Sequence, residues 1–270
     1  MRWKAYAAVL AVFCSFWLVN GQPAAADLIP NIVFTAYNDT VSGPGTHANT
    51  TDYADNAVSS GPLKDIDTGR YTHAVLSTSA QGVTYQNATG GPSRGGDAYN
   101  IFSGYVDFTS NNGNSLELQG SDSYTYSFTN LVTTNIYEFA GTAIRGNSGY
   151  TNRWTLVTIV GAVSFAPAHS IGAGIVTAGL PNNQVALWTG DNSTADQGFV
   201  VQFKDIVPGD DGQFQVVSEQ YTGSIPGGTA DGSKGYAING IRFVEIVPEP
   251  TTLALLSFGA ITLLRRRSVH

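Results

Sequence analysis

The stretch SYTYSFT, Ser123–Thr129, alternates hydroxyl and aromatic side chains along its whole length. Successive side chains of a strand point to opposite faces of the sheet, so the aromatic residues share one face. The alternation therefore predicts a half-buried β-strand with an aromatic core face. Seven further segments show weaker versions of the pattern: Asn31–Tyr37, Tyr71–Ser77, Asn135–Arg145, Arg153–Val160, Gly198–Ile206, Gln213–Glu219 and Gly235–Ile246.

Turn signals rich in Gly, Asn, Asp and Pro separate these segments, without long amphipathic helices between them. Only 12% of the 270 residues are charged and 31 are glycine, which disfavours helical bundles and parallel α/β enzymes. Short strands joined by turns predict antiparallel sheets, and two sheets packed face to face bury both apolar faces. We expect an all-β antiparallel β-sandwich of jelly-roll type over residues 27–246, with a closed barrel as the alternative.

The N-terminus has the pattern of a cleavable signal peptide. Arg2 and Lys4 precede the uncharged, mostly apolar stretch Ala5–Val19, and small residues follow at Ala24 and Ala26. This order predicts that signal peptidase removes residues 1–26. The alternative is a permanent anchor, for which fifteen apolar residues are short, because a bilayer span needs about 20.

Composition limits the chemistry and the partners of the mature chain. Cys14 and Met1 are the only sulfur-containing residues and both precede the predicted cleavage site, which excludes disulfides, thiolate nucleophiles and cysteine metal clusters afterwards. Residues 27–247 hold eight Lys and Arg against nineteen Asp and Glu, a formal charge of −11. Such a surface does not suit nucleic acid, and it repels anionic polysaccharide unless divalent ions bridge the two.

The C-terminus combines a proline motif, an apolar run and a basic cluster. Pro248, Glu249 and Pro250 precede the uncharged stretch 251–264, and Arg265, Arg266 and Arg267 follow it. As a helix, fourteen residues span about 21 Å of the roughly 30 Å hydrocarbon layer, so we expect a short transmembrane helix whose long Arg side chains reach the interface. The Arg cluster favours the cytoplasmic side, which places the β-rich domain outside the inner membrane.

This tail, VPEPTTLALLSFGAITLLRRR within residues 247–270, resembles the PEP-CTERM sorting signal of Gram-negative and related bacteria. The resemblance implies that Pro248, Glu249 and Pro250 are recognised by an exosortase and that Arg265 to Arg267 form the cytoplasmic stop. It also implies a single-pass inner-membrane intermediate, processing near the motif, and delivery to the cell surface or an exopolysaccharide matrix. An ordinary single-pass anchor is the alternative, because any apolar run with a basic stop orients in this way.

Parts of the central domain resemble galactose-binding-like and malectin-like carbohydrate-binding domains. The resemblance rests on the strand Ala237–Ile246, with its Asn-Gly-Ile core, and on Tyr137–Gly141 with Arg145 followed by Trp154–Ile159. It implies a β-sandwich in which the last two segments are paired central strands, and it implies a carbohydrate ligand.

The best candidate for a glycan contact is Trp188, which lies close to Asp191 and Asn192. Sugar binding uses an aromatic face for CH groups and polar side chains for hydroxyls. The alternative is a packed Trp at the end of a strand formed by Val185 and Leu187.

Calcium is the only cofactor that the sequence leaves open, because oxygen donors are frequent and sulfur is absent. Asp191 and Asp196 form one oxygen-rich loop, and Asp210 and Asp211 form another. Neither loop has the spacing of the twelve-residue calcium loop, and Asx turns bonded to local backbone are the favoured explanation of both.

The sequence shows no catalytic constellation. Gly91–Gly95 matches the G-x-S-x-G nucleophile pattern, but we expect a loop without the strand-to-helix turn that this chemistry needs. No H-x-x-x-H or H-E-x-x-H spacing occurs, which leaves a zinc hydrolase unsupported. We therefore expect a non-catalytic, exosortase-sorted surface or matrix protein that binds exopolysaccharide or another glycan. The alternatives are a secreted carbohydrate-active hydrolase and, more remotely, an ice-binding protein.

Overall fold

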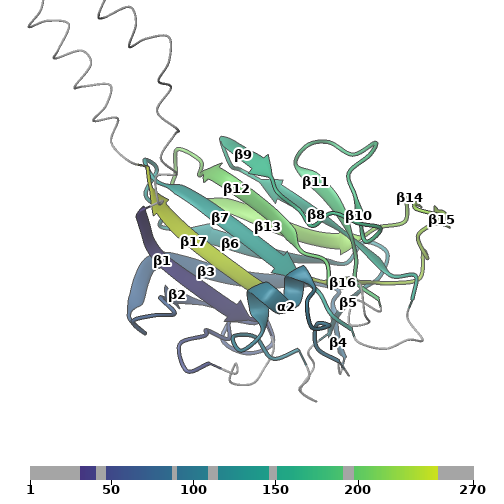
Figure 1. The fold of residues 1–270 in the computed structure, drawn as a ribbon, viewed down its shortest axis with the longest axis horizontal. Coiled ribbons are helices and arrows are strands. Elements are labelled where there is room, and N and C mark those ends of the chain that lie inside the picture. The colour runs from purple at the N-terminus through teal and green to yellow at the C-terminus, as the bar shows by residue number, and fades with distance from the viewer. Residues whose placement is uncertain are drawn as a thin grey trace, which may run out of the picture. The chain divides into compact units, whose positions relative to one another are not determined.

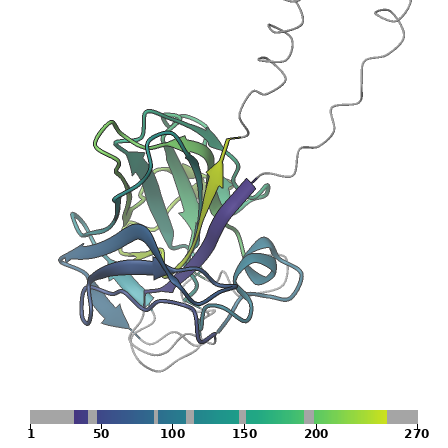
Figure 2. The same cartoon turned by 90° about the vertical axis from the view of Figure 1, so that its left-hand side faces the viewer.

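Two antiparallel β-sheets face each other across an aromatic core (Figures 1 and 2). The computed structural model describes residues 31–40, 47–86, 90–108, 115–145, 151–190 and 198–248. Within these, one sheet has the strand order β1 (Asn31–Asp39), β17 (Gly240–Val247), β7 (Ile136–Thr142), β12 (Val201–Val207) and β9 (Ser164–Pro167). The other has the order β10 (Ile175–Val176), β11 (Gln184–Trp188), β8 (Trp154–Val160), β13 (Phe214–Gln220), β6 (Ser123–Thr129), β3 (Tyr71–Gln81) and β2 (Ser60–Lys64).

Smaller elements flank the two sheets. They are a three-stranded sheet of β16 (Gly235–Ala237), β5 (Ser115–Leu118) and β4 (Thr84–Gln86), a hairpin of β14 (Ser224–Ile225) and β15 (Gly228–Thr229), and the short helix α2 (Asp97–Phe102). The predicted all-β, antiparallel sandwich is confirmed. The barrel alternative is wrong, because both main sheets end in edge strands, and the jelly-roll type stays a prediction.

The core forms where the aromatic face of β6 meets the five-stranded sheet. Tyr124, Tyr126 and Phe128 are buried while their hydroxyl neighbours are partly exposed, as the alternation predicts. The ring centroid of Phe128 lies 4.4 Å from that of Phe243 in β17, across the sandwich, and 5.1 Å from that of Phe214 in its own sheet. Stacked rings at these distances bury large apolar areas, so the sheets are held together without disulfides.

Two sequence expectations about strand pairing are wrong. The segment Gly235–Ile246 is not one strand. β16 pairs with β5 in the three-stranded sheet, and the chain then enters the five-stranded sheet as β17. Tyr137–Gly141 and Trp154–Ile159 do not pair with each other either, because β7 and β8 belong to different sheets. Alternation marks a strand and its buried face, but it does not name the neighbouring strand.

The sandwich has two distinct ends. β1 begins and β17 ends side by side, and we call this the terminal end (Figures 1 and 2). At the opposite end, β17 begins beside α2, and we call this the helix end (Figure 1). No helix within the described residues is long and apolar enough to cross a membrane. The predicted signal peptide, residues 1–26, and the predicted apolar helix, residues 251–264, lie outside the described residues.

Candidate binding groove at the helix end

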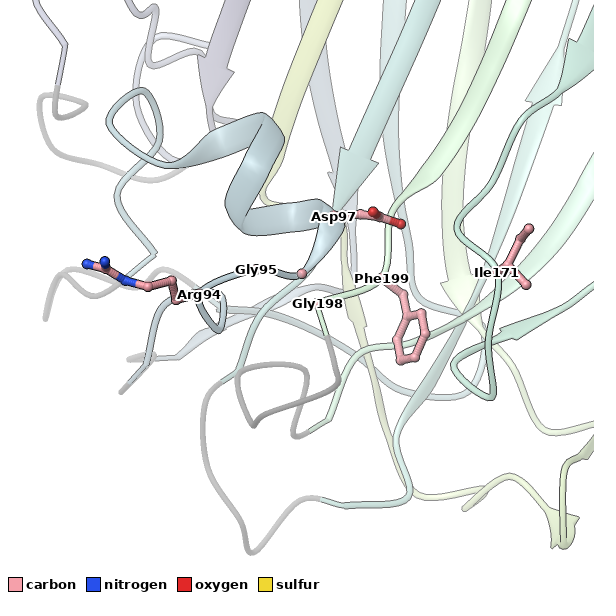
Figure 3. A pocket seen from close by; sticks show the side chains of 7 residues that line it. Arg94, Gly95, Asp97, Ile171, Gly198 and Phe199 are labelled. Atoms are coloured by element: carbon pink, nitrogen blue, oxygen red, sulfur yellow. The ribbon is translucent and has the colours of Figure 1, made fainter.

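A groove runs along the helix end between the start of α2 and the segment that follows β9. Two adjoining pockets of about 460 Å³ and 490 Å³ share Asp97 and Ile171 in their walls. A third pocket of about 340 Å³ continues past Pro167–Gly172. Asp97 and Ile171 face the first pocket from two sides and Phe199 lies between them, whereas Arg94 extends away (Figure 3). We call these joined pockets the groove.

Backbone hydrogen bonds fix one wall of the groove to the five-stranded sheet. The chain beyond β9 continues to pair with the start of β12, because the Ala168 N–H donates to the Gln202 carbonyl at 2.9 Å and the Ser170 N–H donates to the Val200 carbonyl at 3.0 Å. The opposite wall is held where the Ala98 N–H, in the first turn of α2, donates to the Gly198 carbonyl at 2.8 Å. Both walls are therefore hydrogen-bonded to the same stretch of chain, residues 198–202.

Phe199 forms the floor because a glycine makes room for it. A Cβ added to Gly174 would lie 2.0 Å from Cδ2 of Phe199, far inside van der Waals contact. The Phe199 carbonyl also accepts a hydrogen bond from the Thr142 hydroxyl at 2.7 Å. Ring and backbone are thus both held in place.

A carboxylate and a hydroxyl meet inside the groove. The Ser170 hydroxyl donates to Oδ2 of Asp97 at 2.6 Å and accepts a hydrogen bond from the Val200 N–H at 2.8 Å. Asp97 itself is exposed. The second carboxylate oxygen is therefore placed to accept a hydrogen bond from a ligand, and Ser170 fixes the orientation of the carboxylate.

The neighbouring His169 presents a neutral imidazole. Its Nδ1 accepts a hydrogen bond from the Gln202 N–H at 3.1 Å, which places the proton of the neutral ring on Nε2. The ring packs edge-on against Phe203, with 5.1 Å between the centroids. Burial lowers the pKa of His169 to about 4. Nε2 is buried without a hydrogen-bond partner among the described residues, so the ring holds an unused donor beside the groove.

These contacts differ from those of a Ser–His–Asp triad. In a triad the histidine lies between the serine and the carboxylate, whereas here Ser170 bonds directly to Asp97 and His169 bonds to backbone. Among the described lining residues, Asp97 is the single carboxyl group, while glycosidases use a pair. The arrangement suits hydrogen bonding and positioning of a ligand.

The terminal end holds a buried carboxylate that sequence reasoning missed. Oε1 of Glu245 accepts hydrogen bonds from Asn135 Nδ2 at 2.7 Å and from the Tyr137 hydroxyl at 2.9 Å, and it lies 3.3 Å from Nε2 of His73. Burial and the neighbouring Glu245 raise the pKa of Tyr137. The Glu245 side chain has no exposed surface, so this cluster stabilises the fold and cannot reach a ligand.

Trp188, the predicted glycan contact, does not line the groove. It is half-buried, stacks on Trp154 with 6.1 Å between ring centroids, and donates its indole N–H to the Thr151 carbonyl at 2.5 Å. These contacts match the alternative of a packed Trp at a strand end. Its predicted partners Asp191 and Asn192 lie outside the described residues.

Only two of the four predicted calcium ligands lie within the described residues. Asp191 and Asp196 lie outside the described residues, while Asp210 and Asp211 occupy the turn between β12 and β13. Asp211 accepts hydrogen bonds from the backbone N–H and the side-chain amide of Gln213, as in an Asx turn. Within the described ranges, no group of three or more His, Cys, Asp or Glu side chains is arranged to hold a metal ion.

The G-x-S-x-G match at Gly91–Gly95 forms a loop, but the expectation that no helix follows it is wrong. α2 begins at Asp97, two residues beyond the motif. The helix has only six residues and begins without a side-chain cap, since Gly96 occupies the N-cap position. The motif therefore serves as the loop that brings Asp97 to the groove.

The comparisons with known proteins concern the end of the chain. Residues 247–268 match the family model described as the PEP-CTERM protein-sorting motif, which confirms the resemblance seen in the sequence. β17 ends at Val247, so the match begins at the last residue of the sandwich, and Pro248 is exposed. Seven other predicted sorting and processing residues lie outside the described residues: Ala24, Ala26, Glu249, Pro250 and, in the basic stop, Arg265, Arg266 and Arg267. No curated protein and no solved structure gives a significant match to the chain.

Proposed function

Because the chain ends in a sorting motif that indicates export and sorting by an exosortase to the cell surface, we propose that the sandwich is displayed there as a non-catalytic saccharide-binding domain. In this proposal signal peptidase removes residues 1–26, the apolar tail holds a single-pass intermediate in the inner membrane, and the groove binds a polysaccharide of the envelope or matrix. The observation that carries the binding role is the groove, where Asp97 and Ser170 meet at 2.6 Å beside the apolar Ile171.

The groove combines the contacts that a sugar ring requires. The exposed Asp97 carboxylate accepts hydrogen bonds from hydroxyl groups, and the Ser170 hydroxyl holds it in place. Ile171, with 99% of its surface exposed, and the Phe199 floor offer apolar surface to the CH faces of the ring. A hollow that offers both polar groups and apolar surface is typical of ligand-binding sites.

Charge narrows the class of saccharide. Asp97 carries a negative charge in the groove, and the domain around it has an excess of acidic residues. An anionic polysaccharide would meet like charge at its binding site, so a neutral saccharide is favoured. A divalent cation is not required for this mode of binding.

Retention of the full chain on immobilised neutral polysaccharide from the producing cells tests the binding role. We expect Asp97→Ala to weaken binding about tenfold or more, because a hydrogen bond to a charged group contributes about 1.5–3 kcal/mol. Ile171→Ser should weaken binding less. The matched control is Asp210→Ala, which removes an exposed carboxylate at the terminal end and should bind as the wild type does.

Two outcomes would contradict the proposal. Equal retention of wild type and Asp97→Ala would show that the groove is not the site. Release of reducing ends during the incubation would instead support the hydrolase alternative, and Asp97→Ala would then abolish the release. The sorting role is checked separately by the intact mass of surface-released protein, which should place the new C-terminus close to Pro250.

A further inference from the structure

Exposed aliphatic side chains collect at the terminal end of the sandwich. Most of the large exposed hydrophobic residues in the described ranges lie there, and the group that we call the apolar rim consists of Ile32, Val33, Val132, Val160, Val163 and Val247. Outside it, Ile171 belongs to the groove at the helix end, and Val58 precedes β2. A concentration of this kind at one end marks a contact surface.

Strand registers bring the rim residues of the five-stranded sheet together. Val247 ends β17, next to β1, in which Ile32 and Val33 are the second and third residues. On the other side, Ile246 pairs with Ile136 at the start of β7, so the preceding loop with Val132 lies at this end too. The Val132 N–H donates to the Tyr137 hydroxyl at 2.8 Å, which holds this loop against the sheet.

The turn between β8 and β9 completes the rim. The Val163 N–H donates to the carbonyl of Val207, the last residue of β12, at 2.9 Å. Val160 is the last residue of β8 and pairs with Gln215 near the start of β13. Both sheets therefore contribute aliphatic side chains to the same end of the sandwich.

The short length of chain between the rim and the apolar run indicates what covers the rim. Only three residues, 248–250, separate Val247 from the uncharged apolar run at 251–264. The step from Val247 to residue 251 spans at most about 14 Å when fully extended. While the apolar run is in the membrane, Val247 therefore stays within about this distance of residue 251, which keeps the terminal end of the sandwich near the bilayer.

We propose that the apolar rim lies against the lipid headgroup region of the bilayer in the membrane-held precursor and aligns the sandwich for processing. This inference rests on the proposed function, because it requires the apolar run to be inserted. The acidic turn at Asp210 and Asp211 is adjacent to the turn with Val163, since a Cβ added to Gly209 would lie only 2.9 Å from the Gly161 carbonyl oxygen. A zwitterionic lipid surface therefore suits the rim better than an anionic one.

Lipid-attached quenchers test the contact in the full chain. A Cys14→Ser background receives one labelled cysteine, either Val132→Cys in the rim or, as controls, Ile171→Cys or Val58→Cys. The chains are reconstituted into phosphatidylcholine vesicles that carry nitroxide headgroups. We expect quenching at Val132→Cys to be several times that at either control, and Val163→Asp to lower it without changing the thermal midpoint.

Equal quenching at all three positions would overturn the inference. A label at Val132→Cys that is shielded from iodide but not quenched by lipid would also overturn it, because a protein, such as a second copy, would then cover the rim. Extraction with alkaline carbonate separates the two proposals. A chain that carbonate releases from the vesicles contradicts the inserted tail, whereas an unreleased chain with an unquenched rim contradicts this inference alone.

Discussion

The helix end and the terminal end each position one carboxylate, with opposite consequences. Asp97 is exposed at the helix end, where a single hydroxyl, that of Ser170, orients it. Glu245 is fully buried at the terminal end, where Asn135 and Tyr137 donate hydrogen bonds to it and His73 lies close by. The same chemical group is therefore available to a ligand at one end and fixed within the core at the other.

The difference shows how solvent exposure separates a binding role from a structural role. A buried carboxylate is tolerated because several donors replace its water, so it contributes to folding and is closed to ligands. An exposed carboxylate adds little to stability, but it retains unused acceptor capacity. The terminal end then presents aliphatic surface, while the helix end presents polar groups in a hollow.

Removing the carboxylates of Glu245 and Asp97, one at a time, should give the largest difference in stability between the two ends. We expect Glu245→Ala to lower the free energy of unfolding by about 2–4 kcal/mol, because it empties a buried site and removes the acceptor shared by the Tyr137 hydroxyl and the partly exposed Asn135 amide. Asp97→Ala should cost less than about 1 kcal/mol, since the side chain is exposed. Urea denaturation of both variants checks the contrast, and similar midpoint shifts would contradict it.

A matched pair of glycine substitutions tests the floor of the groove. Gly174→Ala forces Cβ against the Phe199 ring, so we expect a loss of about 1–2 kcal/mol and weaker saccharide binding. Gly228→Ala in β15 is the control, because nothing lies within 4 Å of its added Cβ and it should change neither property. Thermal unfolding and polysaccharide retention report the two effects, and a Gly174→Ala variant that matches the control would show that Phe199 is free to move.

The sequence predicts those features of the molecule that depend on a contiguous run of residues. Alternation reveals β6 because Tyr124, Tyr126 and Phe128 must share the core face. The sorting motif is equally local, and residues 247–268 match it. Short edge strands such as β9 and β10 escape prediction, because two to four residues hold too little alternation to distinguish a strand from a loop.

The groove could not be predicted in the same way, because it depends on distant residues. Asp97 and Ser170 are 73 positions apart, and only the packing of α2 against the start of β12 brings them together. No spacing rule links His169 to them. Trp188 carried a local signal, an aromatic residue beside polar ones, and its ring stacks on Trp154 away from the groove, so its glycan contact stays a prediction.

Protonation of His169 should change stability by no more than Gly174→Ala does, and its effect depends on pH. Its pKa is about 4 in the folded chain and about 6.5 when unfolded, so between these values the unfolded chain binds a proton that the folded chain excludes. The stability contributed by the neutral ring is complete above pH 6.5 and is lost as the pH falls toward 4. Because the ring is partly exposed, we expect a loss of about 1–2 kcal/mol.

His169→Gln isolates this contribution, since its amide oxygen can still accept the hydrogen bond from the Gln202 N–H. Unfolding free energies of wild type and variant are compared at pH 7.5 and pH 4.5. The wild type should lose more stability than the variant on acidification, by about 1–2 kcal/mol. Parallel pH profiles would mean that water reaches the ring, and His169 would then be a solvated residue of the groove wall rather than a neutral donor held beside it.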